Sequence, residues 1–410
     1  MKKTLIVLIT LCLAVSAFAS GAGEDGGYKG VTNKAFQAPL SLERGTLTYD
    51  LFTNPAALAE NKLIVELPSV AVSDFNFAKT ISSPSVAEAV SQMMRFKFTK
   101  SNVVRFLAGC VKNVGTGYNS AAKVDAELGV AIGKVGFALN AVVDVKSMPA
   151  FEEGTETPID YKHKPQGLLY TGIVPFADVA ATLAYGTRVF ENNSMYINIG
   201  GSLRVIRRMY FKQLNASNLL EDGFDFNIKG TRGGFAFPFD LAAEVGLLDG
   251  KLKLGATFNN FNGYFYMQEY PTFDDVLRNT RGYNKYTVYT PWSANLSVEY
   301  DTGWKYVRPI LTFRIEDING FIQNDLNTNG GKKPWGELVT HLTARADIRI
   351  VKFINLNASF RNGYPEFGAS VDIYGNTIEF AYGYHEAGTL YGEKPVDTFT
   401  LRVKLGFDNN

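Results

Sequence analysis

Apolar and polar residues alternate along most of the chain after about Lys62. The segment at 396–407 shows the pattern most clearly: its apolar positions are Phe399, Leu401, Val403, Leu405 and Phe407, and its polar positions are Thr398, Thr400, Arg402 and Lys404. Successive side chains of a β-strand face opposite sides. Each alternating segment is therefore predicted to be a strand with one apolar and one polar face.

The same pattern recurs often enough to predict about fourteen strands. They are expected at 62–77, 120–132, 135–147, 168–188, 194–208, 233–247, 251–262, 291–301, 304–316, 337–350, 353–361, 365–374, 376–385 and 396–407. Short and long connections alternate between them. The short ones are Gly133-Lys134, Glu191-Asn192-Asn193, Leu248-Asp249-Gly250, Asp301-Thr302-Gly303, Val351-Lys352 and Tyr374-Gly375-Asn376. The long ones are 78–119, 148–167, 209–232, 263–290, 317–336 and 386–395, and only Asn362-Gly363-Tyr364 departs from the rule.

This parity of connections decides between two all-β architectures. A soluble sandwich also uses alternating strands, but nothing in it requires short turns at one end and long loops at the other. A transmembrane antiparallel up-and-down β-barrel has both features, and an even strand count places both termini on the side of the short turns. We therefore predict a barrel of about 14 strands at 62–407.

Charged residues on the polar faces are expected to point into the barrel. An Arg or Lys on the lipid face at the bilayer midplane costs about 2–4 kcal/mol. Both signs occur on these faces, which indicates a cross-linked interior; the residues are Arg308, Arg314, Arg345, Arg349, Arg361, Arg402, Glu316, Asp347 and Glu379. The alternative is that these charged residues lie on the solvent-exposed face of a soluble β-sandwich.

The first residues resemble a secretory signal. Lys2 and Lys3 precede a short apolar run, and Ala17-Phe18-Ala19 supplies small residues around a cleavage site. We expect a signal peptide at 1–19 and export to the bacterial outer membrane. Cys12 falls within this segment, so Cys110 is the only cysteine left and has no partner for an intramolecular disulfide.

Composition and motifs exclude several classes of function. The 410 residues carry a formal net charge of +1, which argues against a nucleic-acid partner. His163, His341 and His385 have no ligand-spaced companions, so no metal site or cofactor is expected. No nucleophile elbow or phosphate-binding glycine loop is present, and we expect no catalytic residues. His385 with Glu379 is the best candidate for an enzymatic role, although an inward-facing polar side chain explains it more simply.

Residues 20–61 do not alternate, yet Phe36 to Leu58 include enough apolar side chains to pack in a lumen that side chains alone cannot fill. The segment ends in Asn54-Pro55-Ala56-Ala57-Leu58-Ala59, just before the first strand. In this position the motif resembles that of the FadL-type outer-membrane transporters of long-chain fatty acids and other hydrophobic compounds. The resemblance implies an amino-terminal hatch, or plug, inside the barrel at 20–61, with Asn54, Pro55 and Ala56 as its motif. A disordered periplasmic tail is the alternative.

The resemblance also implies that outer loops capture a hydrophobic ligand, which leaves when the hatch moves. The loops corresponding to the family's capture groove are 209–232 and 263–290. Both are rich in aromatic residues, and exposed apolar patches usually bind something. The candidate capture residues are Tyr210, Phe211, Leu219, Leu220, Tyr264, Phe265, Tyr266, Met267 and Phe273. Alternatively, these side chains only cap the barrel mouth or belong to an interfacial girdle.

Two further segments bear on partners. Residues 84–108 have apolar positions at helical spacing, which predicts a helical insertion in the first outer loop. Leu401 to Phe407 is expected to be read by the barrel-assembly machinery. We expect a monomer in contact with outer-membrane lipid and a hydrophobic small-molecule ligand. A surface or secretion-associated barrel that binds a protein partner through its long loops is the alternative.

Overall fold

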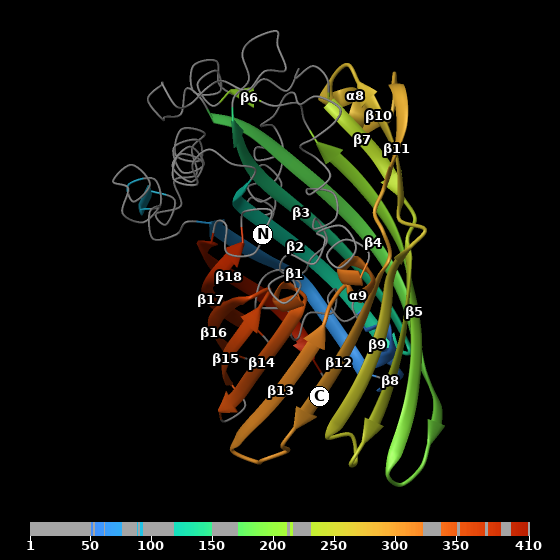
Figure 1. The fold of residues 1–410 in the computed structure, drawn as a ribbon, viewed down its shortest axis with the longest axis vertical. Helices are drawn as coiled ribbons and strands as arrows, with labels where there is room; N and C mark the ends of the chain where they lie inside the picture. The colour runs from blue at the N-terminus through green and yellow to red at the C-terminus, as the bar shows by residue number, and fades with distance from the viewer. Residues whose placement is uncertain are drawn as a thin grey trace.

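The computed structural model describes 51, 54–60, 62–75, 88, 91–92, 119–149, 171–210, 214–215, 231–322, 338–350, 353–373, 376–386 and 395–408. Within these residues the chain forms one closed antiparallel β-barrel, in which the last strand pairs with the first (Figure 1). The first strands are β1 (Lys62–Phe75), β2 (Asn119–Gly133), β3 (Val135–Pro149), β4 (Thr171–Glu191), β5 (Met195–Tyr210), β6 (Leu214–Asn215), β7 (Thr231–Ala236), β8 (Phe239–Leu247) and β9 (Leu252–Phe261). The remaining strands are β10 (Tyr264–Tyr270), β11 (Tyr283–Tyr289), β12 (Ser293–Asp301), β13 (Val307–Ile315), β14 (Leu342–Ile350), β15 (Ile354–Arg361), β16 (Tyr364–Ile373), β17 (Asn376–Glu386) and β18 (Pro395–Asp408).

Fourteen of the expected spans are present, and the prediction of the fold is confirmed. Three spans are each divided into two strands, namely β7 with β8, β9 with β10, and β11 with β12. Strand β6 is a two-residue addition that pairs with the outer end of β4. Short helical segments complete the fold: η1 (Pro55–Glu60), α8 (Phe273–Arg278) and α9 (Ile318–Gly320).

The three divisions lie side by side in neighbouring spans. They fall at Phe237-Pro238, at Asn262-Gly263 and at 290–292, which contains Pro291. Proline has no N–H to donate to a sheet, and Asn262 has a positive φ of 59°. Side chains replace part of the lost pairing, because Asn262 Nδ2 donates to the carbonyl oxygen of Phe237 at 3.1 Å.

The wall is taller on one side than on the other. Strands β2 to β5 contain 15 to 21 residues, whereas β13 to β17 contain 8 to 11. A tilted strand needs about 9–11 residues to cross the hydrocarbon core. The orange and red strands β13–β17 are therefore about long enough to cross it, and the green and yellow strands reach farther toward the end that carries β6 and α8 (Figure 1).

Side chains follow the predicted inward and outward alternation. Large exposed apolar residues such as Leu183, Leu203 and Leu311 lie on the outward face, where lipid would surround them. Inward positions hold buried charges that pair with one another. Arg402 of β18 lies 3.6 Å from Glu379 of β17. Within β14, Arg345 donates to Asp347 through Nε at 2.9 Å and Nη2 at 2.7 Å. The predicted cross-linked interior is confirmed for these residues. Within the described part of the chain, no helix is long and apolar enough to cross a membrane.

Several boundaries differ from the prediction. Residues 263–290 were expected to form a loop, but they form β10, α8 and β11, which extend the wall upward. The turn expected at 301–303 runs from Thr302 to Tyr306, and 338–340 is helical and precedes β14. Within the expected insertion at 84–108, Glu88, Ser91 and Gln92 are α-helical. The signal segment 1–19 and hatch residues 20–50 lie outside the described residues.

Candidate functional site

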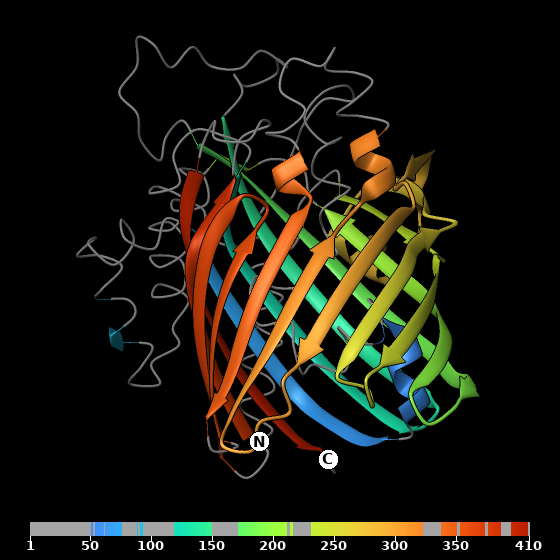
Figure 2. The ribbon, with the colours of Figure 1, turned by 60° about the horizontal axis from the view of Figure 1, so that its bottom comes forward.

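The segment before β1 lies inside the barrel, against the inner face of β3, β4 and β5. Figure 2 shows this blue helical segment, η1, behind the green and yellow strands near the short-turn end. Three inward-facing glycines, Gly136, Gly186 and Gly200, allow the close approach. A Cβ atom on Gly186 would lie 2.4 Å from the carbonyl oxygen of Pro55, and one on Gly200 would lie 2.5 Å from the backbone nitrogen of Ala56. Any larger residue there would overlap the segment.

Apolar contacts fill the space beneath the same segment. Leu51 and Leu58 pack on three small inward-facing residues, Ala131, Ala138 and Ala184. A Cβ atom on Gly136 would lie 2.5 Å from Cδ2 of Leu51. The inner wall of β2 to β4 is thus made of small residues wherever the segment touches it.

Polar contacts hold the two ends of η1. Asn54 Nδ2 donates to Oε2 of Glu244 at 2.9 Å, and Asn198 Nδ2 donates to the other oxygen of Glu244 at 3.3 Å. At the far end Lys253 pairs with Glu60 at 3.1 Å. Of the predicted motif residues, Pro55 and Ala56 are buried and Asn54 makes the contact to the wall.

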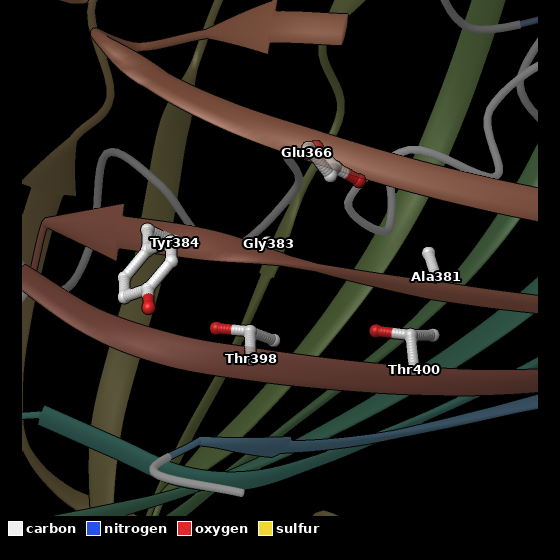
Figure 3. A pocket seen from close by; sticks show the side chains of 6 residues that line it. All are labelled: Glu366, Ala381, Gly383, Tyr384, Thr398 and Thr400. Atoms are coloured by element: carbon white, nitrogen blue, oxygen red, sulfur yellow. The ribbon is translucent and has the colours of Figure 1, made fainter. Parts of the chain in front are cut away.

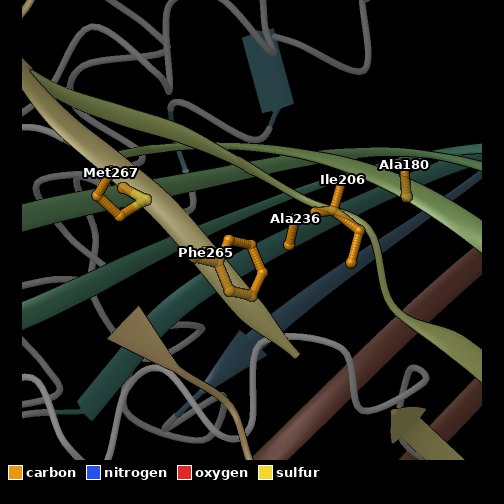
Figure 4. Packing of buried hydrophobic residues seen from close by; sticks show 5 residues of the cluster. All are labelled: Ala180, Ile206, Ala236, Phe265 and Met267. Carbon is orange, nitrogen blue, oxygen red and sulfur yellow. The ribbon is translucent and has the colours of Figure 1, made fainter. Parts of the chain in front are cut away.

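A second apolar surface lies on the inner wall toward the long-loop end. We call it the inner apolar patch, and it consists of Ala180, Ile206, Ala236, Phe265 and Met267 (Figure 4). These residues come from β4, β5, β7 and β10, and Tyr286 and Val288 of β11 pack against them. Each patch residue is buried, with at most 3% of its surface exposed. It is an apolar area within an interior that is otherwise rich in charge.

Two ion pairs border the inner apolar patch on β5. Arg208 donates to Asp178 through Nε at 2.9 Å and Nη2 at 2.8 Å, and its guanidinium lies 3.9 Å from the ring centre of Phe265. Arg204 makes the same two-pronged contact with Asp240, at 2.9 and 2.8 Å. Ile206 stands between the two arginines on the inward face.

The opposite wall is polar. Arg402 lies 3.6 Å from Glu379 and 3.9 Å from Glu127, so it links β17, β18 and β2. Between β16, β17 and β18 there is a cavity of about 10 Å³, lined by Glu366, Ala381, Gly383, Tyr384, Thr398 and Thr400 (Figure 3). That volume suits a single water molecule. We assign no ligand to it.

The expected capture residues separate into two sets on β10. Phe265 and Met267 face inward and belong to the inner apolar patch, whereas Tyr264 and Tyr266 face outward and are 44% and 57% exposed. All four were expected in an outer loop, and that placement is wrong, because the alternation of a strand continues through them. Tyr210 ends β5 and Phe273 begins α8. Phe211, Leu219 and Leu220 lie outside the described residues.

Helix α8 packs on the outward side of the extended wall. Its Val276 approaches Gly233 and accepts a hydrogen bond from the guanidinium of Arg207. Arg207 faces outward and lies over the ring of Phe235 at 4.2 Å. This arginine is therefore turned away from the lumen.

Three residues of the inner apolar patch were not expected from the sequence, namely Ala180, Ile206 and Ala236. The two ion pairs that border the patch were not expected either. Ala180, Ile206 and Ala236 sit in ordinary alternating strands, and nothing local separates them from other inward positions. The run Arg204-Val205-Ile206-Arg207-Arg208 was the available signal, since an apolar inward residue there stands between two inward charges.

Neither metal nor catalytic chemistry gains support from the described residues. No cluster of His, Cys, Asp and Glu among them has the geometry of a metal site. His341 Nδ1 lies 2.9 Å from the backbone oxygen of Glu316, a contact within the fold. The side chain of His385 is outside the described set.

No protein-family model matches the sequence, and no curated protein does. Solved structures with a similar fold include the toluene transporter TodX of P. putida, with 9% identity, a TM-score of 0.40, and coverage of 88% of this chain and 94% of that one. A Pseudomonas aeruginosa FadL homologue has 10% identity and a TM-score of 0.39 over 87% and 93%. The CymD monoaromatic hydrocarbon channel has 8% identity and a TM-score of 0.39 over 87% and 91%. Similarity at this level does not assign a substrate, and the fold assignment rests on the strand pairing itself.

Proposed function

We propose that this protein transports hydrophobic small molecules, such as long-chain fatty acids or similar compounds, across the bacterial outer membrane. The observation that carries the proposal is the inner apolar patch, which places Ile206, Phe265 and Met267 on the inside of a membrane-spanning barrel. An apolar surface facing a lumen is of no use to a general porin, whose channel is filled with water. It suits a ligand that is itself apolar.

The amino-terminal segment supplies the second part of the proposal. Residues 51 and 54–60 lie on the inner wall near the short-turn end, while the inner apolar patch lies toward the long-loop end. A ligand entering from outside would meet the patch first and the segment afterwards. We infer that 20–61 acts as a hatch, that its displacement releases the ligand, and that 1–19 directs export.

Uptake by whole cells tests this function. A bacterium whose own outer membrane excludes a radiolabelled fatty acid or alkane is compared with and without the protein. We expect uptake with the protein, and we expect deletion of 20–53 to alter its rate while the barrel stays folded, as judged by heat-modifiable gel mobility. Absence of binding to a panel of fatty acids, alkanes and retinoid-like ligands would refute the proposal. A large steady conductance in planar bilayers would favour a porin instead.

A protein-binding barrel is a second candidate because of the outward face of β10 and β11. Tyr264, Tyr266 and Tyr289 are exposed there, and the rings of Tyr264 and Tyr289 are 4.7 Å apart. Tyrosine is enriched at protein interfaces. A partner that co-purifies with the wild type and is lost from a Tyr266→Ser, Tyr289→Ser variant would favour this reading.

A further inference from the structure

Among the residues that the structure describes, the arginines around the inner apolar patch are engaged by carboxylates or turned away from the lumen. Arg208 and Asp178 make a two-pronged contact in which the side chains are 2% and 1% exposed. Arg204 and Asp240 do the same with 1% and 0% exposed. Arg232, farther toward the long-loop end, pairs with Glu269 at 2.7 Å. Arg207 of the same strand faces outward, to α8.

In each pair the aspartate occupies Nε and Nη2 of the guanidinium, and Asp240 is held by further bonds. Asp240 also accepts from Ser202 Oγ at 2.7 Å and from the backbone nitrogen of Asn260 at 2.8 Å. Arg204 adds a bond of 2.7 Å to Oδ1 of Asn260. A ligand carboxylate could make the two-pronged contact with Nε and Nη2 of either arginine only by displacing its aspartate.

At the pair of Arg208 and Asp178, the ring of Phe265 is a further obstacle to a ligand carboxylate. The centre of this ring lies 3.9 Å from the guanidinium of Arg208, so an aromatic ring covers the charge on the side of the inner apolar patch. An ionised carboxylate placed against such a surface loses its hydration without gaining a partner, which is unfavourable. An uncharged apolar ligand loses nothing comparable.

We propose that Asp178 and Asp240 are specificity determinants, which cancel the charges of Arg208 and Arg204 so that the inner apolar patch accepts uncharged hydrophobic ligands and rejects carboxylates. The inference rests on the proposed transport function and narrows its substrate class to neutral apolar molecules. Removing either aspartate frees a guanidinium beside Ile206. Charge-assisted hydrogen bonds from a guanidinium to a carboxylate are strong, so the preference should then move toward carboxylates.

Binding of two probes that differ only in the head group tests the inference. The full-length purified protein is titrated with radiolabelled hexadecanol and with hexadecanoate in one detergent, at about pH 8 where a carboxyl is ionised. The wild type is expected to prefer hexadecanol by at least about tenfold, because Arg204 and Arg208 beside the inner apolar patch are already paired with aspartates. Asp178→Asn should reduce this ratio by about tenfold, because it releases Arg208.

Three further variants separate specificity from general disturbance. In the double variant Asp178→Asn, Arg208→Gln both charges are gone, and the wild-type ratio should return. Asp240→Asn should act like Asp178→Asn, and it retains the bond between Arg204 and Asn260 that supports folding. Asp347→Asn removes the partner of Arg345 on the opposite wall, so the ratio should not change.

The possible outcomes separate the specificity role of the two aspartates from the proposed transport of hydrophobic molecules. Wild-type protein that binds hexadecanoate as tightly as hexadecanol overturns the inference and leaves hydrophobic transport standing. A ratio unchanged in both folded aspartate variants, or changed equally by Asp347→Asn, also overturns it. Failure of the wild type to bind either probe overturns the proposed function itself.

Discussion

Asn54 Nδ2 donates a hydrogen bond of 2.9 Å to Oε2 of Glu244, which joins two residues 190 positions apart in the sequence. The bond attaches the amino-terminal segment to β8, and Gly186 and Gly200 let the same segment touch β4 and β5. The position of this segment thus depends in part on a buried acceptor, Glu244, and on glycines in the wall that leave room for its backbone. Both features can be tested separately.

The glycine contact is tested by Gly200→Ala. The added methyl would lie 2.5 Å from the backbone of Pro55 and Ala56, and such overlap costs about 1–3 kcal/mol. We expect cleavage after Glu60 by a glutamate-specific protease to rise by roughly five- to 150-fold in the folded barrel. The neighbouring Gly201 faces outward, so Gly201→Ala is the control and should be cleaved like the wild type. Equal rates for both variants and the wild type would contradict the contact.

The polar anchors are expected to differ in strength. Glu244→Ala leaves the amides of Asn54 and Asn198 without their buried acceptor, a loss of about 1–3 kcal/mol. Lys253→Met removes a partly exposed pair with Glu60, which contributes about 0–1 kcal/mol. Protease sensitivity of the segment should therefore increase more for Glu244→Ala. The reverse order would show that Lys253 is the main anchor.

Alternation along β10 predicts which aromatic residues meet the ligand. Phe265→Ala should weaken binding of hexadecanol by about tenfold or more, because a buried aromatic side chain contributes about 1.5–3 kcal/mol. Tyr266→Ala, one residue away on the outward face, should leave the affinity unchanged. Equilibrium binding to the purified barrel measures both. If Tyr266→Ala has the larger effect, the ligand binds outside the lumen.

The lipid-facing surface is tested in the middle of β13. Leu311 faces outward and is 50% exposed. Leu311→Arg should lower the free energy of unfolding by about 2–4 kcal/mol in lipid vesicles, the cost of a cation near the midplane. Leu311→Ala, which adds no charge, should cost less. Urea titrations followed by tryptophan fluorescence give both values, and equal losses would place Leu311 away from the lipid.

The fold was predictable because its signals are local and repeated. Alternation assigns each strand and its faces, and Gly and Asn mark turns such as Asn362-Gly363, where φ is 50° and 87°. The prediction failed at 263–290, which was expected to be a long connection between two strands but forms β10, α8 and β11. Tyr264, Phe265, Tyr266 and Met267 are all apolar or aromatic and do not alternate in polarity, because Phe265 and Met267 pack in the inner apolar patch and the outward positions are tyrosines.

Sequence alone therefore determined the barrel, its span number and the inward direction of its charges, since each follows from a period of two residues and from the cost of charge in lipid. Tertiary structure alone decided which charges meet. Arg208 reaches Asp178 and not another inward carboxylate because strand register sets Asp178 opposite it in β4. Closure of the barrel likewise brought Glu244 to Asn54. Partners this distant are selected by register and packing, which no local pattern encodes.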